Sequence, residues 1–492
     1  MSFDNIQSLP YLVPELLLTV TLIAIFIGDL AIANKQRLGE IALVGTAMAL
    51  VALSRLSSWP DGWLFNRMIV HDQFAVFFKL IFALATVATV LMSLSSNEVQ
   101  RSSQGEYYGI LLSSTLAMFF MASASNLLMA YLSLEFVSLT SYTLTGILKH
   151  NRRSGEAALK YLIYGGVASG AMIYGMSWIF GLTGSMDYAR IGEALSQGGA
   201  NQLALFIALV LTFAGFGYKI AAVPFHMWAP DVYQGAPIPV TAFLSVGSKA
   251  AGFALLIRFF YPALSRLTAS GEWTAAPGVE WPQLVLVLSM LTMTLGNFAA
   301  LSQQNLKRLL AYSSIAHAGY VLMGFVVLSN DGLRAMMFYL LVYYLMNIGA
   351  FLVVMIVANS TGREDLDGYR GLAWRGGAAP AVAMAIFLFS LAGLPPLAGF
   401  IGKFYLFAAV IEGHFYWLAL VGVLNSVVSL YYYARIVKAM FLDQPAGNEG
   451  DVAVGLQDGC VLWTLAAATL GLGLYWSPAM GLVERSLHFF IG

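Results

Sequence analysis

Four ionisable residues lie deep inside long apolar runs of this 492-residue sequence, where a charge is costly. They are Glu135 in YLSLEFVSLTSY, Lys219 in GFGYKIAAVPF, Lys249 in LSVGSKAAGF and Lys403 in GFIGKFYLF. An ammonium group in a low-dielectric site binds its proton less tightly, and a nearby carboxylate restores that affinity. Together these residue types predict a chain of groups that load and release protons.

Glu135 and Lys219 suit a switch within this chain, because movement of the carboxylate towards or away from the lysine would change how firmly the lysine holds its proton. Glu135 lies about ten residues from either end of its apolar run, beyond the reach of a snorkelling side chain. The alternative is that each of the four charges forms a structural pair or extends to an interface. Function is the favoured interpretation for ionisable residues at this depth.

Prolines interrupt two of these runs beside the lysines. Pro224 follows Lys219, and the stretch LAGLPPLAGFIGKFYLF (391–407) places Pro395 and Pro396 before Lys403. A proline removes a backbone donor, and irregular backbone inside a membrane is tolerated only where it lines a polar cavity. We therefore expect broken helices near 219–230 and 391–404, with Lys403 and its break together forming a proton-loading site.

Two histidines are weaker candidates for the same pathway. His226 follows Pro224-Phe225 at the first break, and His317 lies in the middle of the run AYSSIAHAGY. Histidine titrates near neutral pH, which suits a proton relay. A lone buried histidine is commonly a hydrogen-bonding residue instead, and both interpretations stay open for both residues.

Four other ionisable residues lie nearer to the ends of their runs. Long cationic side chains there can extend to the interface, so we expect Lys79, Lys160 and Arg258 to snorkel. Glu15 follows Pro14 in the first turn of a helix, where a carboxylate suits the helix dipole. Structural roles are expected for all four.

Cofactor-binding motifs are missing from the sequence. Gly402-Lys403 is followed by Phe404 rather than the Ser or Thr of a phosphate-binding loop. The six histidines show no metal-ligand spacing, and the single cysteine, Cys460, cannot hold an iron–sulfur cluster. We expect no cofactor and no metal to be bound by this chain.

Composition places the chain in a lipid bilayer. Hydrophobic residues make up 59% of it, charged residues 10%, and mean hydropathy is +0.76. A soluble domain has roughly 25% charged residues. The 25 basic and 25 acidic residues balance, which gives no basic footprint for nucleic acid.

About fourteen apolar runs are long enough to cross a membrane, so the expected fold is an all-α integral membrane protein. The start of the chain lacks the basic region of a cleavable signal, and we expect the first span to be retained. The runs fall near 11–33, 38–56, 73–95, 107–124, 126–148, 157–180, 202–225, 238–263, 282–301, 306–329, 332–358, 379–411, 413–440 and 460–482.

Three pairs of features recur in the same order and predict an internal repeat. Ala130-Tyr131 matches Ala311-Tyr312 at an offset of 181, AALKYLIY (157–164) matches AMMFYLLV (335–342) at 178, and Lys219 matches Lys403 at 184. A shift of five helices reverses orientation, so we expect two inverted five-helix repeats, as in transporters with midplane sites. The predicted division is an N-terminal three-helix segment (1–106), a first repeat (107–263), a second repeat (282–440) and a C-terminal helix (460–482).

Loop charges predict the orientation, because cytoplasmic loops are enriched in Lys and Arg. Twelve such residues in one set of alternate loops face five in the other, so both termini are expected on the positive side, away from the cytoplasm. The larger set is Lys35, Arg37, Arg101, Lys149, Arg152, Arg153, Lys307, Arg308, Arg363, Arg370, Arg375 and Lys438; the smaller is Arg67, Arg190, Arg266, Arg334 and Arg485.

Four ordered motifs resemble the antiporter-like subunits of respiratory complex I. They are LSLEFVSLTSY (132–142), VPFHMWAPDVYQGAPIPVTAF (223–243), NLKRLLAYSSIAHAGY (305–320) and LAGLPPLAGFIGKF (391–404), and the resemblance covers nearly the whole chain. Within the family, one subunit type matches best. The chain ends after about fourteen spans without a long lateral helix, carries lysine at 403 and opens with LVPELLL.

The resemblance implies a proton-pumping module of a bacterial cell membrane. By it, Glu135 and Lys219 form an input pair, Lys249 is a bridging residue and Lys403 is the output residue. NADH, FMN, iron–sulfur clusters and quinone would be bound by other subunits, and the partners would be other membrane-arm subunits, including other antiporter-like ones. Alternatives are a cation/proton antiporter subunit of the Mrp type, a membrane subunit of an energy-converting hydrogenase, or a scaffold, against which the four buried charges argue.

Overall fold

The computed structural model describes residues 3–100, 103–199, 201–268, 273–276, 280–445 and 451–487. Eleven helices in these ranges are long and apolar enough to cross a membrane, or up to thirteen if each of two bent helix pairs counts as one span. The helix α6 (Gln104–Ser123) occupies the further predicted run near 107–124. The predicted all-α membrane fold with about fourteen spans is confirmed.

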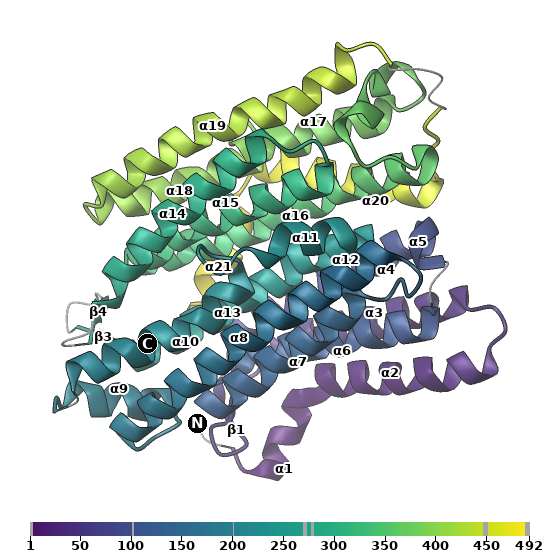
Figure 1. Ribbon diagram of the computed structural model, residues 1–492. Helices are drawn as coiled ribbons and strands as arrows, with labels where there is room; N and C mark the ends of the chain where they lie inside the picture. Colours follow the sequence, from purple (N-terminus) through teal and green to yellow (C-terminus); the bar gives the residue numbers. More distant parts are fainter. Residues whose placement is uncertain are drawn as a thin grey trace.

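The N-terminal part contributes three long helices: α2 lies outermost along one edge of the molecule, and α4 lies in the interior and is largely buried (Figure 1). Its elements are α1 (Asn5–Ser8), η1 (Leu9–Leu12), α2 (Val13–Ala31), α3 (Gln36–Leu56), β1 (Gly62–Leu64), β2 (Ile69–His71), α4 (Gln73–Ser95) and α5 (Asn97–Gln100).

The middle part contains the first broken helix. After α6 it comprises α7 (Leu127–Thr145), α8 (Arg152–Thr183), α9 (Tyr188–Ser196), α10 (Gln202–Ile220), α11 (Trp228–Gly235), α12 (Ile238–Phe243), the π-helical η2 (Leu244–Ser248), α13 (Lys249–Leu264), β3 (Ser265–Leu267) and β4 (Trp273–Ala275).

The C-terminal part contains the second broken helix, between α17 and α18. It comprises α14 (Trp281–Leu301), α15 (Leu306–Val326), α16 (Asn330–Thr361), η3 (Leu366–Tyr369), η4 (Leu372–Trp374), α17 (Ala378–Ala392), α18 (Ala398–Glu412), α19 (Tyr416–Phe441), α20 (Leu456–Leu474) and α21 (Ser477–Arg485).

Two β-hairpins were not expected from the sequence. Strand β1 pairs antiparallel with β2, and β3 pairs with β4, each over three residues. Both fall in polar segments between spans and lie with α9 at one end of the helices, whereas α5 lies at the other end (Figure 1).

The middle and C-terminal parts share the same construction. Asn126 and Asn305 cap α7 and α15, and each forms an antiparallel bridge with an aspartate, Asp187 and Asp365 respectively. Helices α8 and α16 each have 32 residues and end at a left-handed glycine. We propose on these features that α6–α13 and α14–α19 are the two five-helix repeats; the boundaries given above stay a prediction.

The predicted equivalence of Lys219 and Lys403 is wrong. Lys219 lies in the last turn of α10, before its break, whereas Lys403 lies in α18, after its break. Left-handed residues end the two first halves, Ala221 after α10 and Gly393 after α17. When these are aligned, Lys403 corresponds to Asp231, because the break rather than the charge sets the register.

Arg258 and Lys79 do not snorkel, contrary to expectation. The Arg258 guanidinium forms two hydrogen bonds with Asp72, 2.7 and 2.8 Å long, and both residues are buried. Lys79 Nζ lies 2.7 Å from Glu15 Oε1, also in the interior. Each charge has found a partner from another segment, because an unpaired charge in this interior would be strongly destabilising.

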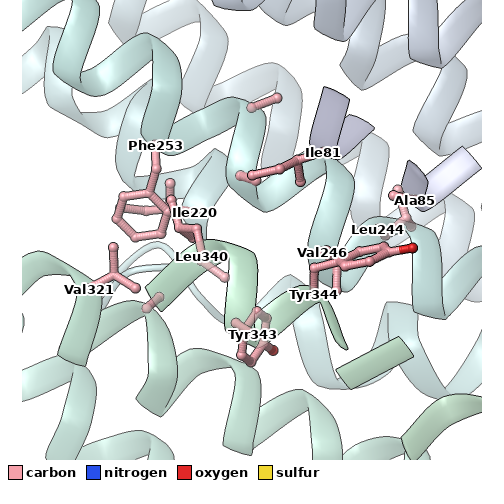
Figure 2. Close-up of a cluster of buried hydrophobic side chains, with 14 of the residues drawn as sticks. Ile81, Ala85, Ile220, Leu244, Val246, Phe253, Val321, Leu340, Tyr343 and Tyr344 are labelled. Carbon is pink, nitrogen blue, oxygen red and sulfur yellow. The ribbon is translucent and has the colours of Figure 1, made fainter. Parts of the chain in front are cut away.

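Apolar side chains fill the seam between the two halves and the N-terminal part. Figure 2 shows residues of this cluster from α4, α10, η2, α13, α15 and α16 converging around one region: Ile81, Ala85, Ile220, Leu244, Val246, Phe253, Val321, Leu340, Tyr343 and Tyr344. Lys219 lies on α10 next to Ile220, and Lys249 begins α13, three residues after Val246. Both lysines are therefore surrounded by close-packed apolar side chains.

Candidate functional site: buried lysines at broken helices

Lys219 occupies the end of the first half of a broken helix. Residues 221–227 separate α10 from α11, and the Trp228 indole donates a hydrogen bond to the Tyr218 carbonyl (3.1 Å) across this gap. Lys219 is 1% exposed, and its ammonium group has no hydrogen-bond partner among the described residues. An ammonium group so placed is poised to give up its proton or to attract an anion.

Glu135 is the carboxylate whose charge acts on Lys219. It lies in the middle of α7, is partly buried, and keeps one carboxylate oxygen without a hydrogen-bond partner among the described residues. Among the described residues, Glu135 and Lys219 do not form an ion pair within 4.0 Å. The two groups therefore interact through space, and a change in their separation would change the interaction steeply.

Lys219 also contacts the helix that carries the next lysine. A Cβ atom on Gly252 would lie 3.2 Å from Lys219 Cγ and 2.8 Å from Ile220 Cγ2. Gly252 lies one helical turn after Lys249 on α13. The absence of a side chain at Gly252 therefore lets α13 approach Lys219 and Ile220 of α10 closely.

Lys249 is held by the second half of the molecule. It begins α13 directly after the π-helical turn η2, is 3% exposed, and donates to the Ser314 carbonyl (2.8 Å) and hydroxyl (2.5 Å) on α15. Ser314 lies nine residues after its helix cap, as Glu135 does on α7. At matching positions, the middle part therefore has the carboxylate of Glu135 and the C-terminal part has the hydroxyl of Ser314.

His317 lies one turn further along α15, within the influence of both Lys249 and Lys403. Its Nδ1 shares a hydrogen bond with the Tyr339 hydroxyl (2.6 Å), and its Nε2 shares one with the Tyr433 hydroxyl (3.1 Å). Tyr433 is in turn bonded to Ser313 (2.5 Å). Every ring nitrogen is thus engaged by a group that can both donate and accept a proton.

Lys403 is fixed at the second break. Its ammonium group donates to the Ala392 carbonyl (2.9 Å), where α17 ends, and to the Ser426 hydroxyl (2.9 Å) on α19. It also lies 4.6 Å from the centre of the Tyr320 ring. The broken helix therefore supplies a free carbonyl to a cation that would otherwise be unsolvated.

His226 lies in the first break, apart from the second cluster. It is 7% exposed, and its Nδ1 has no hydrogen-bond partner among the described residues. The structure thus divides the six predicted site residues between two parts of the molecule. Glu135, Lys219, His226 and Lys249 belong to the middle part, and His317 and Lys403 belong to the C-terminal part, which Lys249 contacts through Ser314.

Sequence reasoning missed the serine and tyrosine side chains that contact these charged groups. They are Ser313, Ser314, Tyr320, Tyr339, Ser426 and Tyr433. Ser313 and Ser314 could have been found, since they lie four and three residues before His317 respectively and so share its face of the helix. The tyrosines could not, because apolar spans of this composition contain many.

A polar cavity of about 620 Å³ opens at the end of the molecule that carries α5. Its lining includes Glu98, Lys307 and Glu364. Lys307 is 1% exposed and donates to the Ala236 carbonyl (2.8 Å) and to Glu364 (3.0 Å), while Glu98 accepts from the Ile238 amide (2.9 Å). The cavity therefore ends at the gap between α11 and α12.

Among the described residues, no group of three or more His, Cys, Asp or Glu side chains could hold a metal ion. The expectation that this chain binds no cofactor stays a prediction. The chemistry available in the interior is proton transfer between lysine, histidine, carboxylate and hydroxyl groups.

Broken helices with buried lysines at each break define the antiporter-like class of membrane proteins. The family model described as NADH:quinone oxidoreductase/Mrp antiporter matches residues 124–429, and the chain belongs to this family. The sequence features favour subunit N of NADH–quinone oxidoreductase, the counterpart of mitochondrial subunit 2, and this prediction is confirmed. Subunit N of Anaeromyxobacter sp. (strain Fw109-5) is 47% identical over 99% of this chain and 98% of its own length.

Solved structures agree with this assignment. A chain of respiratory complex I from Thermus thermophilus has a TM-score of 0.81 and 31% identity, covering 96% of this chain and 100% of that one. A chain of the Mrp complex from Dietzia sp. DQ12-45-1b has a TM-score of 0.85 but 22% identity, covering 97% of each, and shares the fold alone.

Replacing Gly252 by alanine tests the contact between Lys219 and the helix of Lys249. The new Cβ must displace Lys219 or Ile220, so Gly252→Ala should lower proton pumping per NADH oxidised while the complex still assembles. Gly247→Ala is the matched control, since its Cβ would come no closer than 3.4 Å to any neighbour, the flexible Met118 Cε being the nearest atom. Equal pumping by both variants, measured in vesicles, would show that this close approach is irrelevant.

Proposed function

We propose that this chain moves protons across the membrane through Glu135, Lys219, Lys249 and Lys403, while NADH oxidation and quinone reduction take place in other subunits of the complex. The observation that carries the proposal is that the buried interior holds three separate hydrogen-bonded groups of proton donors and acceptors: Lys249 with Ser314, His317 with Tyr339 and Tyr433, and Lys403 with Ser426. A series of donors and acceptors enclosed by apolar packing can pass protons without admitting bulk water.

The four residues take distinct roles in this proposal. Glu135 and Lys219 form the input pair, since the lysine has no partner of its own among the described residues. Lys249 bridges the two halves through Ser314, and Lys403 is the output residue. His317 relays between the last two, because its ring nitrogens meet hydroxyl groups on both sides; His226 is the weaker candidate.

A separate antiporter of the Mrp type is the second candidate, favoured by the shared fold and by the family model, which covers both kinds of protein. Relatives at 40–48% identity over nearly the whole chain are named as subunits of NADH-quinone oxidoreductase. A scaffold role is less economical, because apolar residues would pack the interior without the desolvation cost of four buried charges.

We also propose that the cavity near Glu98 and Glu364 is the entrance for protons to Lys249. Helices α12, η2 and α13 run without interruption from the cavity floor at Ile238 to Lys249, about 16 Å at 1.5 Å per residue. Beside this path, the Tyr233 hydroxyl lies 3.5 Å from the Ser314 hydroxyl that binds Lys249.

Glu98 and Glu364 are the candidates for collecting protons at the entrance, whose lining contains a third carboxylate, Asp365. Asp365 is less suited, because hydrogen bonds from the neighbouring Arg363 lower the pKa of its carboxyl group below the usual value and keep it ionised. Glu364, in contrast, accepts a hydrogen bond from the nearly buried Lys307, which also donates to the Ala236 carbonyl. Protonation of Glu364 would weaken its hold on Lys307 at the helix gap.

Orientation follows from the loop charges. The cavity draws together Asn97, Asn151, Arg153, Lys307 and Arg363, which supports a common end for the loops of the larger basic set. Arg101 of that set lies outside the described residues. We propose that this end faces the cytoplasm and that both termini face the positive side.

Substitution of Lys403 tests the mechanism directly. Lys403→Met cannot carry a proton and Lys403→Arg does not release one, so both variants should assemble and lose most pumping against intact NADH–quinone turnover. Moving a charge against ~100 mV costs about 2.3 kcal/mol, so a residue fixed in either state stops the transfer. Lys438→Met, at an exposed lysine (65%), should pump normally. Full pumping by the arginine variant would rule out a titrating lysine at 403.

The entrance is tested with Glu364→Gln. Loss of the collecting carboxylate should slow pumping in inside-out vesicles, and the deficit should grow as external pH rises and protons become scarce. Glu412→Gln, at an exposed carboxylate, is the control. A deficit that is the same at every pH would point to a structural role for Glu364 instead.

Orientation is tested with two reporter fusions. A reporter in the loop at 150–154 should report the cytoplasm, and one after residue 492 should report the opposite side. Reports from the same side would mean that the number of spans between them is even rather than odd.

A further inference from the structure

Helices α2 and α3 cross at one point in the middle of their length. A Cβ atom on Gly45 would lie 2.1 Å from Thr21 Oγ1 and 2.3 Å from Thr21 Cγ2, so the two helices touch there with no space between them. Glycine at the crossing permits this approach. Beyond the crossing, towards the β1–β2 hairpin, the helices diverge.

The diverging ends enclose an apolar groove of about 570 Å³. Val13 and Leu17 of α2 form one wall, and Met48 and Val51 of α3 form the other. Val51 is 56% exposed and Met48 50%, although both are large apolar side chains. The groove thus opens sideways, at the edge of the molecule formed by α2 (Figure 1).

The depth of the groove matches one leaflet of a bilayer. From Gly45 at the crossing to Arg55 is ten residues, or about 15 Å of helix. The hydrocarbon core of a bilayer is roughly 30 Å thick, so half of it is about 15 Å. The Gly45–Thr21 contact closes the groove near the midplane, and its mouth lies at the headgroup level.

A cation and an aromatic ring stand at this mouth. Arg55 lies in the last turn of α3 and is exposed, and no acidic side chain pairs with it in the part of the chain that the structure describes. Trp59 is 39% exposed and lines the same groove. Tryptophan favours the interface between headgroups and acyl chains, and arginine suits phosphate because its planar guanidinium can bind two oxygens at once.

We infer that this groove binds one phospholipid with an anionic headgroup, its acyl chain between α2 and α3 and its phosphate on Arg55. A membrane helix of a neighbouring subunit fits less well. Such a helix is about 10–12 Å wide and needs a contact along the whole membrane thickness, whereas this groove ends at the midplane crossing. The charge at its mouth also has the sign that attracts an anionic headgroup.

The test uses the whole complex, purified and reconstituted into phosphatidylcholine vesicles with a phosphatidylglycerol probe that carries a photoreactive group on its acyl chain. After irradiation, mass spectrometry should find the label on the peptide that contains Met48 and Val51. Arg55→Gln should lower this labelling about fivefold, since one basic side chain near a membrane surface contributes about 1 kcal/mol. Ala47→Trp, which fills the groove from an exposed position, should abolish it.

Arg266→Gln is the matched control, because Arg266 is another exposed arginine, in the β3–β4 hairpin at the same end of the molecule. It should label like the unmodified protein. Equal labelling in all variants would overturn the proposal in favour of bulk lipid. Equal labelling by a phosphatidylcholine probe would overturn the anionic headgroup, and crosslinks from this peptide to a neighbouring subunit would replace the lipid by a helix.

Discussion

A buried ammonium group needs an oxygen atom to replace water, and this requirement shapes the interior of the protein. Three nearly buried lysines meet it with a main-chain carbonyl: Lys249 with Ser314, Lys307 with Ala236 and Lys403 with Ala392. A carbonyl inside a regular helix already accepts one bond from the next turn, so the Ser314 carbonyl accepts from Lys249 as a second donor, whereas a carbonyl at a helix end has no such bond. Ala236 and Ala392 lie where a helix ends, so interrupted helices and buried charges come together for one reason.

Lys219 is the exception, and the exception suits its proposed role. No carbonyl or hydroxyl in the described ranges accepts from it, so its charge depends on Glu135 acting across space. A lysine bound to a carbonyl has a fixed hydrogen-bond partner for its ammonium group. A lysine without such a bond responds to each change in its surroundings. The input end of the series is therefore the end at which a movement elsewhere in the complex could have the greatest effect.

The breaks and the buried charges could be predicted from the sequence, because proline, glycine and a lysine in an apolar run are local signals. Arg258 and Lys79 could not be placed in the same way. Their partners, Asp72 and Glu15, belong to distant segments, and distance from a span end says nothing about them. The hydroxyl network around His317 was also hidden, since tyrosines in membrane spans usually only pack. The matching of Lys219 with Lys403 failed because similar charges were aligned instead of similar backbone turns.

Once the breaks are aligned, the two halves differ mainly in their charges. Glu135 in the middle part corresponds to Ser314 in the C-terminal part, and Asp231 corresponds to Lys403. Asp231 binds Lys160 on α8 and Arg308 on α15, so it also ties the first half to the second. Carboxylates in one half favour protonated lysines there, whereas the other half offers hydroxyl groups and carbonyls. We propose that this difference in charge between two copies of one scaffold gives the proton transfer its direction.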